Sequence, residues 1–178
     1  MVEQKEKTLA KDKLEFVSGI ITNKDGNVLL LKRNGNLKLD PSKYDFCSGH
    51  IKEGEIPLQS MYRELHEEIG LEPHQIKKIE QVGTIETPHS KLKNTLTHIY
   101  DIQIDLSIEK INEMIKSVPE PEMEKAFYLK DINTLRTVIE EMDNCRMNLT
   151  YEVGIVLEVI EKRVNKRKEE NLKGCEER

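Results

Sequence analysis

The chain has 178 residues, of which 37% are hydrophobic and 34% charged, and its formal net charge is -5. This length suits one domain, and the apolar fraction is sufficient for a core. A nucleic-acid scaffold would show a basic surface, which the negative charge argues against. No run approaches the roughly 20 apolar residues that a membrane-spanning helix needs. Cys47, Cys145 and Cys175 are widely spaced and form no disulfide or metal-ligand pattern, so we expect a reducing, cytoplasmic environment.

The first part of the chain is expected to form short strands. Residues 1–14 are charged and are predicted to be frayed or loosely helical. Turn-forming residues at 23–27 favour a hairpin between two apolar runs. The pattern therefore predicts two strands, a loop and a third short strand, at residues 16–22, 28–32, 33–43 and 44–48.

A helix is predicted for residues 58–69, which are helix formers throughout. Pro57 stands just before it, where its ring suits the first helical turn. Gly70 follows as a natural C-terminal stop. The boundaries of this helix are therefore marked on both sides.

The remaining pattern alternates strands and helices. Two strands, a helix, a strand and a further helix are predicted at 76–87, 91–104, 107–116, 125–129 and 131–142. An amphipathic helix at 151–164 has apolar residues at helical spacing, which suits packing on a sheet or a dimer interface. We expect one domain spanning 15–164, followed by a polar tail, 165–178, that is disordered.

The helix at 58–69 carries an unusual concentration of negative charge. Glu64, Glu67 and Glu68 are spaced three and four residues apart, so they are neighbours on the helix surface and repel one another. Glu67 and Glu68 also lie in the last turn, where the helix dipole disfavours anions. A divalent cation removes this conflict, because Mg²⁺ takes hard oxygen ligands. A purely solvated acidic face is the alternative interpretation.

These glutamates belong to a longer pattern with fixed offsets. It reads Gly49, five residues, Glu55, seven residues, then Arg63-Glu64-Leu65-His66-Glu67-Glu68-Ile69-Gly70-Leu71. The segment resembles the Nudix box, the signature of hydrolases that cleave a nucleoside diphosphate linked to another moiety, and every fixed position is present. The resemblance implies an α/β fold, the Nudix α/β/α sandwich, with a curved mixed sheet between helices. It also implies that Gly49 marks a tight loop and that Glu55 is the acidic residue before the helix.

The family's roles are carried over by position. Glu64, Glu67 and Glu68 match the metal-binding carboxylates, and the resemblance adds the carbonyl of Ser48 to the metal shell. One of these glutamates, most often the one at the position of Glu64, is the family's general base on the attacking water, and the sequence does not decide which. Arg63 matches the arginine that orients a neighbouring glutamate by charge-assisted hydrogen bonding. The expected catalytic residues are thus Glu64, Arg63 and Glu67.

The implied reaction is hydrolysis of a diphosphate linkage with Mg²⁺, for which Mn²⁺ can substitute. The substrate is expected to be a small molecule, and no stable nucleic-acid or membrane partner is expected. The box does not specify which group the diphosphate carries, and a homodimer remains open. The loops at 33–43 and 87–94 and the acidic segment near Pro119 are expected to set substrate choice.

Other residues are weaker candidates. Glu122 and Glu124 lie just before the strand predicted at 125–129 and match a place from which Nudix enzymes recruit another glutamate, as a further metal ligand or an alternative base. His50, Lys32 and Arg33 lie near the expected site and are candidates for phosphate contact. A solvated or structural role is the alternative for each of them.

Two other functions compete with hydrolysis. The residues around Gly49 and His50 also resemble isopentenyl-diphosphate isomerase, which needs a cysteine immediately before that pair. Ser48 occupies this position, and Cys47 is one residue early, where a strand directs its side chain to the opposite face. The other alternative is a non-catalytic Nudix module that binds a ligand. Such modules commonly lose a box residue, whereas this chain keeps all of them.

Overall fold

The computed structural model describes residues 14–39, 41–87 and 95–129. The helices predicted at 131–142 and 151–164, the tail at 165–178 and most of the N-terminal segment lie outside the described residues. No described helix has both the length and the apolar character needed to cross a membrane.

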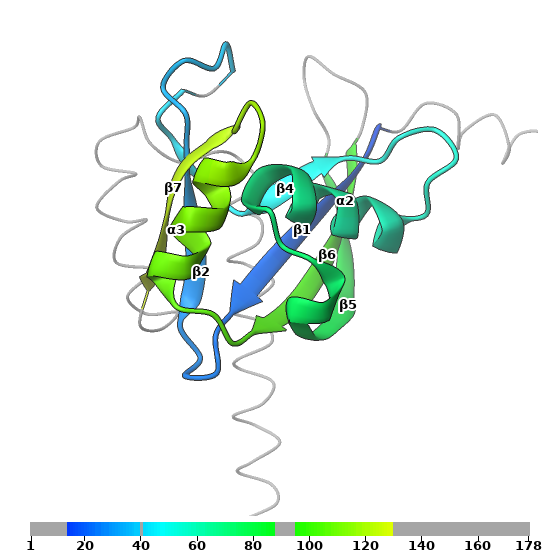
Figure 1. Ribbon diagram of the computed structural model, residues 1–178. Coiled ribbons are helices and arrows are strands. Elements are labelled where there is room, and N and C mark those ends of the chain that lie inside the picture. Colours follow the sequence, from blue (N-terminus) through cyan, green and yellow to red (C-terminus); the bar gives the residue numbers. More distant parts are fainter. Residues whose placement is uncertain (1–13, 40, 88–94, 130–178) are drawn as a thin grey trace, which may run out of the picture.

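The described residues form one mixed sheet with two helices (Figure 1). The strands run in the order β3-β2-β1-β6-β5, with β4 pairing β1 and β7 pairing β2. Only β1 and β6 are parallel among these pairs. The strands are β1 (Leu14–Thr22), β2 (Val28–Arg33), β3 (Tyr44–Asp45), β4 (Cys47–His50), β5 (Ile76–Thr87), β6 (Thr95–Ile104) and β7 (Met123–Leu129). The helices are α2 (Pro57–Ile69) and α3 (Ile108–Ser117), and a short 3-10 turn covers Pro73–Gln75.

The predicted hairpin is present, because β1 and β2 pair antiparallel across this turn, but their pairing is short. The Asn23 side chain accepts hydrogen bonds from the backbone of Asp25 and Asn27, and Gly26 has a φ of 80°. Beyond this turn β1 and β2 share a single aligned pair, Thr22 with Val28. Residues 16–19 of β1 pair antiparallel with β4 instead of with β2. The strand predicted at 44–48 is divided into β3, which pairs with β2, and β4, which pairs with β1 and contacts α2.

Both faces of the sheet are buried. One core cluster includes Leu29 and Leu31 of β2 and Ile21 of β1, packed under α2 and α3. Ile20 and Leu30 are also buried but lie outside this cluster. Because side chains alternate across a strand, these two occupy the opposite face. Burial on both faces is what a sandwich architecture requires.

Helix α2 begins and ends as its sequence predicts. Pro57 occupies the first turn, and the Gln59 side chain accepts a hydrogen bond from the backbone N–H of Ile56. Gly70 is left-handed, with a φ of 70°, and its N–H donates to the carbonyl of His66 at 2.9 Å. A residue without a Cβ adopts this conformation at little cost. The resulting helix lies across β1 and β4 (Figure 1).

Helix α3 lies beside α2 on the same face of the sheet (Figure 1). Ser107 caps it by accepting a hydrogen bond from the N–H of Lys110. Its Asn112 side chain exchanges two hydrogen bonds with the backbone of Ala126, at 2.8 and 3.1 Å. This exchange ties the helix to β7.

Candidate active site

Two of the three predicted metal-binding glutamates are buried. Glu64 and Glu68 are 8% and 3% exposed and face β4, whereas Glu67 is exposed on the same helix. The structure thus excludes the solvated acidic face for Glu64 and Glu68. Burying a carboxylate is costly unless it is paired and hydrogen-bonded. The surroundings of these two side chains therefore define the site.

Arg63 connects the loop before α2 to the glutamates on the helix. Its Nε and Nη2 donate to the two carboxylate oxygens of Glu55, at 2.8 and 3.0 Å. Its Nη1 donates to both Glu64 and Glu67, and its Nη2 also donates to the carbonyl of His50. A guanidinium has five N–H donors in a fixed fork, and each is used here. Arg63 is therefore placed to fix the orientation of Glu64 and Glu67, as the resemblance implies.

The two acidic ends of this network differ in charge balance. The hydrogen bonds from Arg63 and Ser60 lower the pKa of Glu55 to about 2. Burial raises the pKa of Glu64, although Arg63 acts in the opposite direction. The negative charge of Glu55 is thus well balanced by its hydrogen-bond donors, whereas the negative charge of Glu64 on the helix is balanced less completely.

Glu68 is the least compensated of the three glutamates. It accepts hydrogen bonds from the backbone N–H of Ser48, at 3.2 Å, and from the thiol of Cys47. Burial raises the pKa of Glu68 well above its ordinary range, and the nearby charges of Asp45 and Glu64 raise it further. Either a proton or a cation would relieve this unfavourable charge.

Gly49 explains how Glu64 comes so close to the sheet. A Cβ built on Gly49 would lie 2.0 Å from the carboxylate carbon of Glu64, a distance that real atoms do not tolerate. The expectation that Gly49 marks a tight loop is wrong, because this residue lies within β4. The tight turn belongs to Gly54, which has a φ of 85°. Gly49 is required for space rather than for backbone conformation.

The donor set fits a hard divalent cation in its chemistry. Carboxylate oxygens are the ligands Mg²⁺ prefers, and the absence of a side chain at Gly49 lets the carboxylate of Glu64 lie against β4. Among the residues that the structure describes, however, no three His, Cys, Asp or Glu side chains converge as a ready-made metal site. Glu67 is instead engaged by Arg63 and Lys52. The assignment of Glu64, Glu67, Glu68 and Ser48 as metal ligands stays a prediction.

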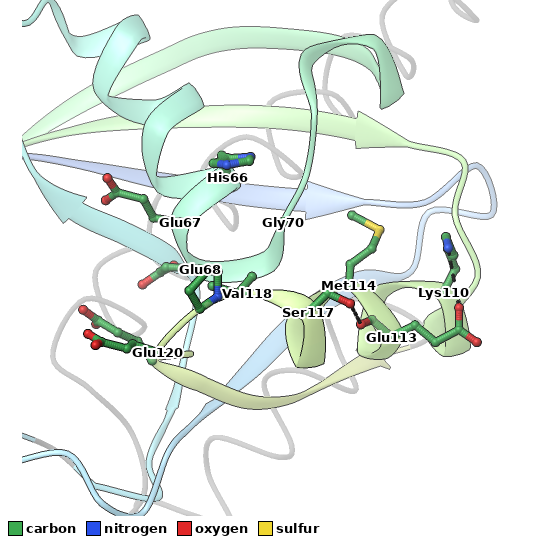
Figure 2. Close-up of a pocket in the computed structure, with 12 residues that line it drawn as sticks. His66, Glu67, Glu68, Gly70, Lys110, Glu113, Met114, Ser117, Val118 and Glu120 are labelled. Atoms are coloured by element: carbon green, nitrogen blue, oxygen red, sulfur yellow. Dashed lines mark hydrogen bonds and ion pairs between the residues drawn. The ribbon is translucent and has the colours of Figure 1, made fainter.

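A cavity of about 640 Å³ lies between the C-terminal half of α2 and α3 (Figure 2). Glu67 and Glu68 line one part of it, and the acidic loop after α3 contributes Glu120 and Glu122. Figure 2 shows the carboxylates of Glu67, Glu68 and Glu120 directed toward the same side. Met114 contributes to the wall formed by α3. Sequence reasoning missed this wall, since an amphipathic pattern does not reveal which helix packs beside α2.

The additional candidates are placed in three different ways. Glu122 lines the cavity and lies 4.0 Å from Arg33, whereas Glu124 pairs with Lys32 at 3.2 Å and is not among the lining residues. The ring of His50 packs edge-on against Phe16. Only Glu122 of these candidates is therefore part of the cavity beside α2.

Cys47 does not resemble an accessible catalytic cysteine. It is 1% exposed, and burial raises the pKa of its thiol well above the usual range, with Glu68 adding to the shift. A reactive cysteine needs exposure and a stabilised thiolate. The position before Gly49 holds Ser48, so the structure adds nothing in favour of the isomerase.

Comparison with known proteins identifies the family. The family model described as the NUDIX domain matches residues 14–142, which is well over half of the chain. The chain belongs to the Nudix family. The match includes the described sheet, both described helices and the whole box.

Relatives and solved structures agree with this assignment. An RNA pyrophosphohydrolase of Psychromonas ingrahamii is 48% identical over 58 residues, which cover 33% of this chain and 29% of the relative. A Deinococcus radiodurans crystal structure has a TM-score of 0.64 at 14% identity and covers 82% of this chain and 81% of its own. The Nudix domain of Shewanella oneidensis NrtR, complexed with ADP ribose, has a TM-score of 0.58 at 18% identity, covering 85% and 88%. The similarity to these solved structures shows the fold, and the predicted Nudix α/β/α sandwich is confirmed.

Proposed function

We propose that the chain is a metal-dependent Nudix hydrolase that cleaves a diphosphate linkage in a small molecule, with Mg²⁺ or Mn²⁺ as its cofactor. The observation that carries this proposal is the arrangement of Glu64, Glu67 and Glu68 along one helix, with Arg63 bracing the first two. Family membership supports diphosphate chemistry. The substrate class proposed is a nucleoside diphosphate linked to another moiety.

The proposed metal ligands are the carboxylates of Glu64, Glu67 and Glu68, together with the carbonyl of Ser48. Bound there, Mg²⁺ or Mn²⁺ would neutralise phosphate oxygens and lower the pKa of a water molecule. The structure offers a physical reason for cation binding, since Glu68 is buried beside Asp45 and Glu64 and its pKa is raised. Metal affinity should therefore increase with pH, because ligands must lose their protons to bind.

The remaining chemistry belongs to the protein side chains. We propose Glu64 as the general base, because this is the role that the family most often gives to its position, and because burial raises its pKa and so makes the carboxylate a better proton acceptor. Arg63 donates to Oε1 of Glu64 and so fixes the carboxylate. Glu55 holds Arg63 in turn through two hydrogen bonds. Catalysis would then depend mainly on positioning and electrostatic stabilisation.

A screen with Mg²⁺ and Mn²⁺ tests the proposal. The panel should contain nucleoside triphosphates, ADP-ribose, dinucleoside polyphosphates, nucleotide sugars, coenzyme A and non-nucleotide diphosphates. A short RNA with a 5′-triphosphate belongs in it as well, because of the relatives named RNA pyrophosphohydrolases. We expect release of a phosphate-containing product that requires the metal and is lost on chelation.

The same screen addresses the alternatives. Conversion of isopentenyl diphosphate into its isomer without hydrolysis would support the isomerase. Binding of a panel compound without turnover under any metal condition would support a non-catalytic module. Either result would contradict the proposed hydrolase.

A further inference from the structure

Lys52 is a basic residue beside the site to which the box assigns no role. It lies between β4 and α2, and its Nζ is 3.3 Å from Oε1 of Glu67. The other oxygen of Glu67, Oε2, accepts a hydrogen bond from Arg63 at 2.9 Å. Each oxygen of this carboxylate is therefore paired with a different cation.

The two cations are held to very different degrees. Arg63 is fixed by five hydrogen bonds, and its side chain is 17% exposed. The side chain of Lys52 is 59% exposed, so its contact with Glu67 is bathed in solvent. Exposed ion pairs are weak and are readily exchanged. Lys52 can thus leave Glu67 without disturbing the fold.

The backbone of Lys52 is nevertheless anchored to the site. Its N–H donates to Oε2 of Glu55 at 3.0 Å, and Glu55 is itself held by Arg63. The backbone of Lys52 is therefore held close to α2, while its exposed side chain is free to change partners. The positive charge of Lys52 also acts on Glu64, where it lowers the carboxyl pKa against the effect of burial.

We propose that Lys52 is the displaceable counter-ion of the metal-free site. It offsets the negative charge of the clustered glutamates until Glu67 binds a divalent cation, and its ammonium then pairs with a phosphate oxygen of the diphosphate ligand. This inference rests on the proposed metal-dependent function. It assigns Lys52 two successive partners, both anionic, which an ammonium with three rotatable donors accommodates.

Two binding measurements on the full chain test the proposal without any turnover. Mn²⁺ affinity is measured by electron paramagnetic resonance in the absence of other ligands. We expect Lys52→Gln to raise this affinity by about threefold, because a competitor of exposed ion-pair strength has been removed. Calorimetry with methylenediphosphonate, a diphosphate that resists hydrolysis, is then performed in saturating Mn²⁺. There Lys52→Gln should weaken binding by about threefold or more.

Two further variants separate this role from a general effect of charge. Lys52→Arg keeps the positive charge at the same place and should stay close to the unsubstituted protein in both measurements. Lys110→Gln removes the same charge from α3, where Lys110 pairs with Glu113 at 3.5 Å, and should leave Mn²⁺ affinity unchanged. Equal increases for Lys52→Gln and Lys110→Gln would contradict a specific counter-ion.

The possible failures are distinguishable. Unchanged or weaker Mn²⁺ binding by Lys52→Gln overturns the inference and leaves the proposed function standing. If Lys52→Gln binds methylenediphosphonate as tightly as the unsubstituted protein does, Lys52 does not pair with a phosphate oxygen of the ligand. Failure of the unsubstituted protein to bind Mn²⁺ overturns the proposed metal dependence and this inference with it.

Discussion

Helices α2 and α3 lie side by side on one face of the sheet, yet their charges are arranged in opposite ways. In α3, Ser107 caps the N-terminus, Glu109 lies in the first turn and Lys116 lies in the last, which suits the helix dipole. In α2, the N-cap is Ile56, whose side chain has no polar atom, and the glutamates gather toward the C-terminal end. The second arrangement opposes the dipole.

This difference separates a helix arranged for stability from one arranged for chemistry. The positions of Glu109 and Lys116 in α3 are explained by the helix itself, since each lies at the end where its charge is favourable. The glutamates of α2 become favourable only when a cation balances them, such as Arg63 on the same helix, Lys52 from the preceding loop or a bound metal ion. Charges that oppose the dipole of one helix thus indicate a functional site when a neighbouring helix of the same protein places its charges favourably.

The largest expected effect is on turnover. Glu67→Gln should lower it by at least about two orders of magnitude, the scale expected when one electrostatic stabiliser is lost. The same substitution in α3, Glu109→Gln, should leave turnover unchanged. Steady-state kinetics in saturating Mg²⁺, with circular dichroism to show an intact fold, makes the comparison. Equal turnover in the two variants would remove the distinction between the helices.

The next effect concerns the space that β4 leaves for α2. Gly49→Ala places a Cβ against the carboxylate of Glu64 and should reduce turnover by about tenfold or more through misplacement of this group. Gly83→Ala is the matched control, because its added Cβ would meet no atom within 4 Å. Mn²⁺ affinity, measured in both variants, should fall only for Gly49→Ala. Full Mn²⁺ affinity in Gly49→Ala would refute the spatial role of this glycine.

Without metal, neutralising a glutamate in α2 and neutralising one in α3 should change the free energy of unfolding in opposite directions. The pKa of Glu68 is raised by burial, so its favourable contribution is complete below about pH 4.5 and is lost as pH rises through the folded value. Glu68→Gln should therefore stabilise the metal-free protein near neutral pH by about 1–3 kcal/mol, the scale for a buried uncompensated polar group. Chemical unfolding from pH 4 to 8 measures this difference, which should shrink toward pH 4.

In α3 the sign is reversed. The pKa of Glu109 is lowered, first by a backbone hydrogen bond and then by Ser107, so its contribution is present above the ordinary value of 4.5 and is lost in acid. Glu109→Gln should consequently destabilise the protein slightly near neutral pH. A stabilising effect of Glu109→Gln would show that the two helices do not differ as described.

The smallest effect belongs to the cap of α3. Ser107→Ala removes the acceptor for the N–H of Lys110 and should cost about 1 kcal/mol of stability. Turnover should remain unchanged, since the hydroxyl of Ser107 accepts its hydrogen bond from the first turn of α3 and does not line the cavity. A thermal melt and an activity assay on one preparation test both statements. Loss of turnover at unchanged stability would mean that α3 takes part in the chemistry.

Much of the fold was accessible from local signals. The turn at Asn23 and the boundaries of α2 depend on residues close together in the chain, and both were predicted. The pairing of β1 with β4 and β6 was not predicted, because these strands come from distant parts of the chain. The helices predicted at 131–142 and 151–164 lie outside the described residues.

For the site itself, the sequence alone determined which carboxylates stand together, because helical spacing makes Glu64, Glu67 and Glu68 neighbours. It did not determine their environments. Tertiary structure decided that Glu64 rests against Gly49, that Glu68 meets Cys47, and that Lys52 reaches Glu67. Burial and pairing depend on which strand lies beneath the helix, and this long-range choice sets the charge balance on which the proposed chemistry depends.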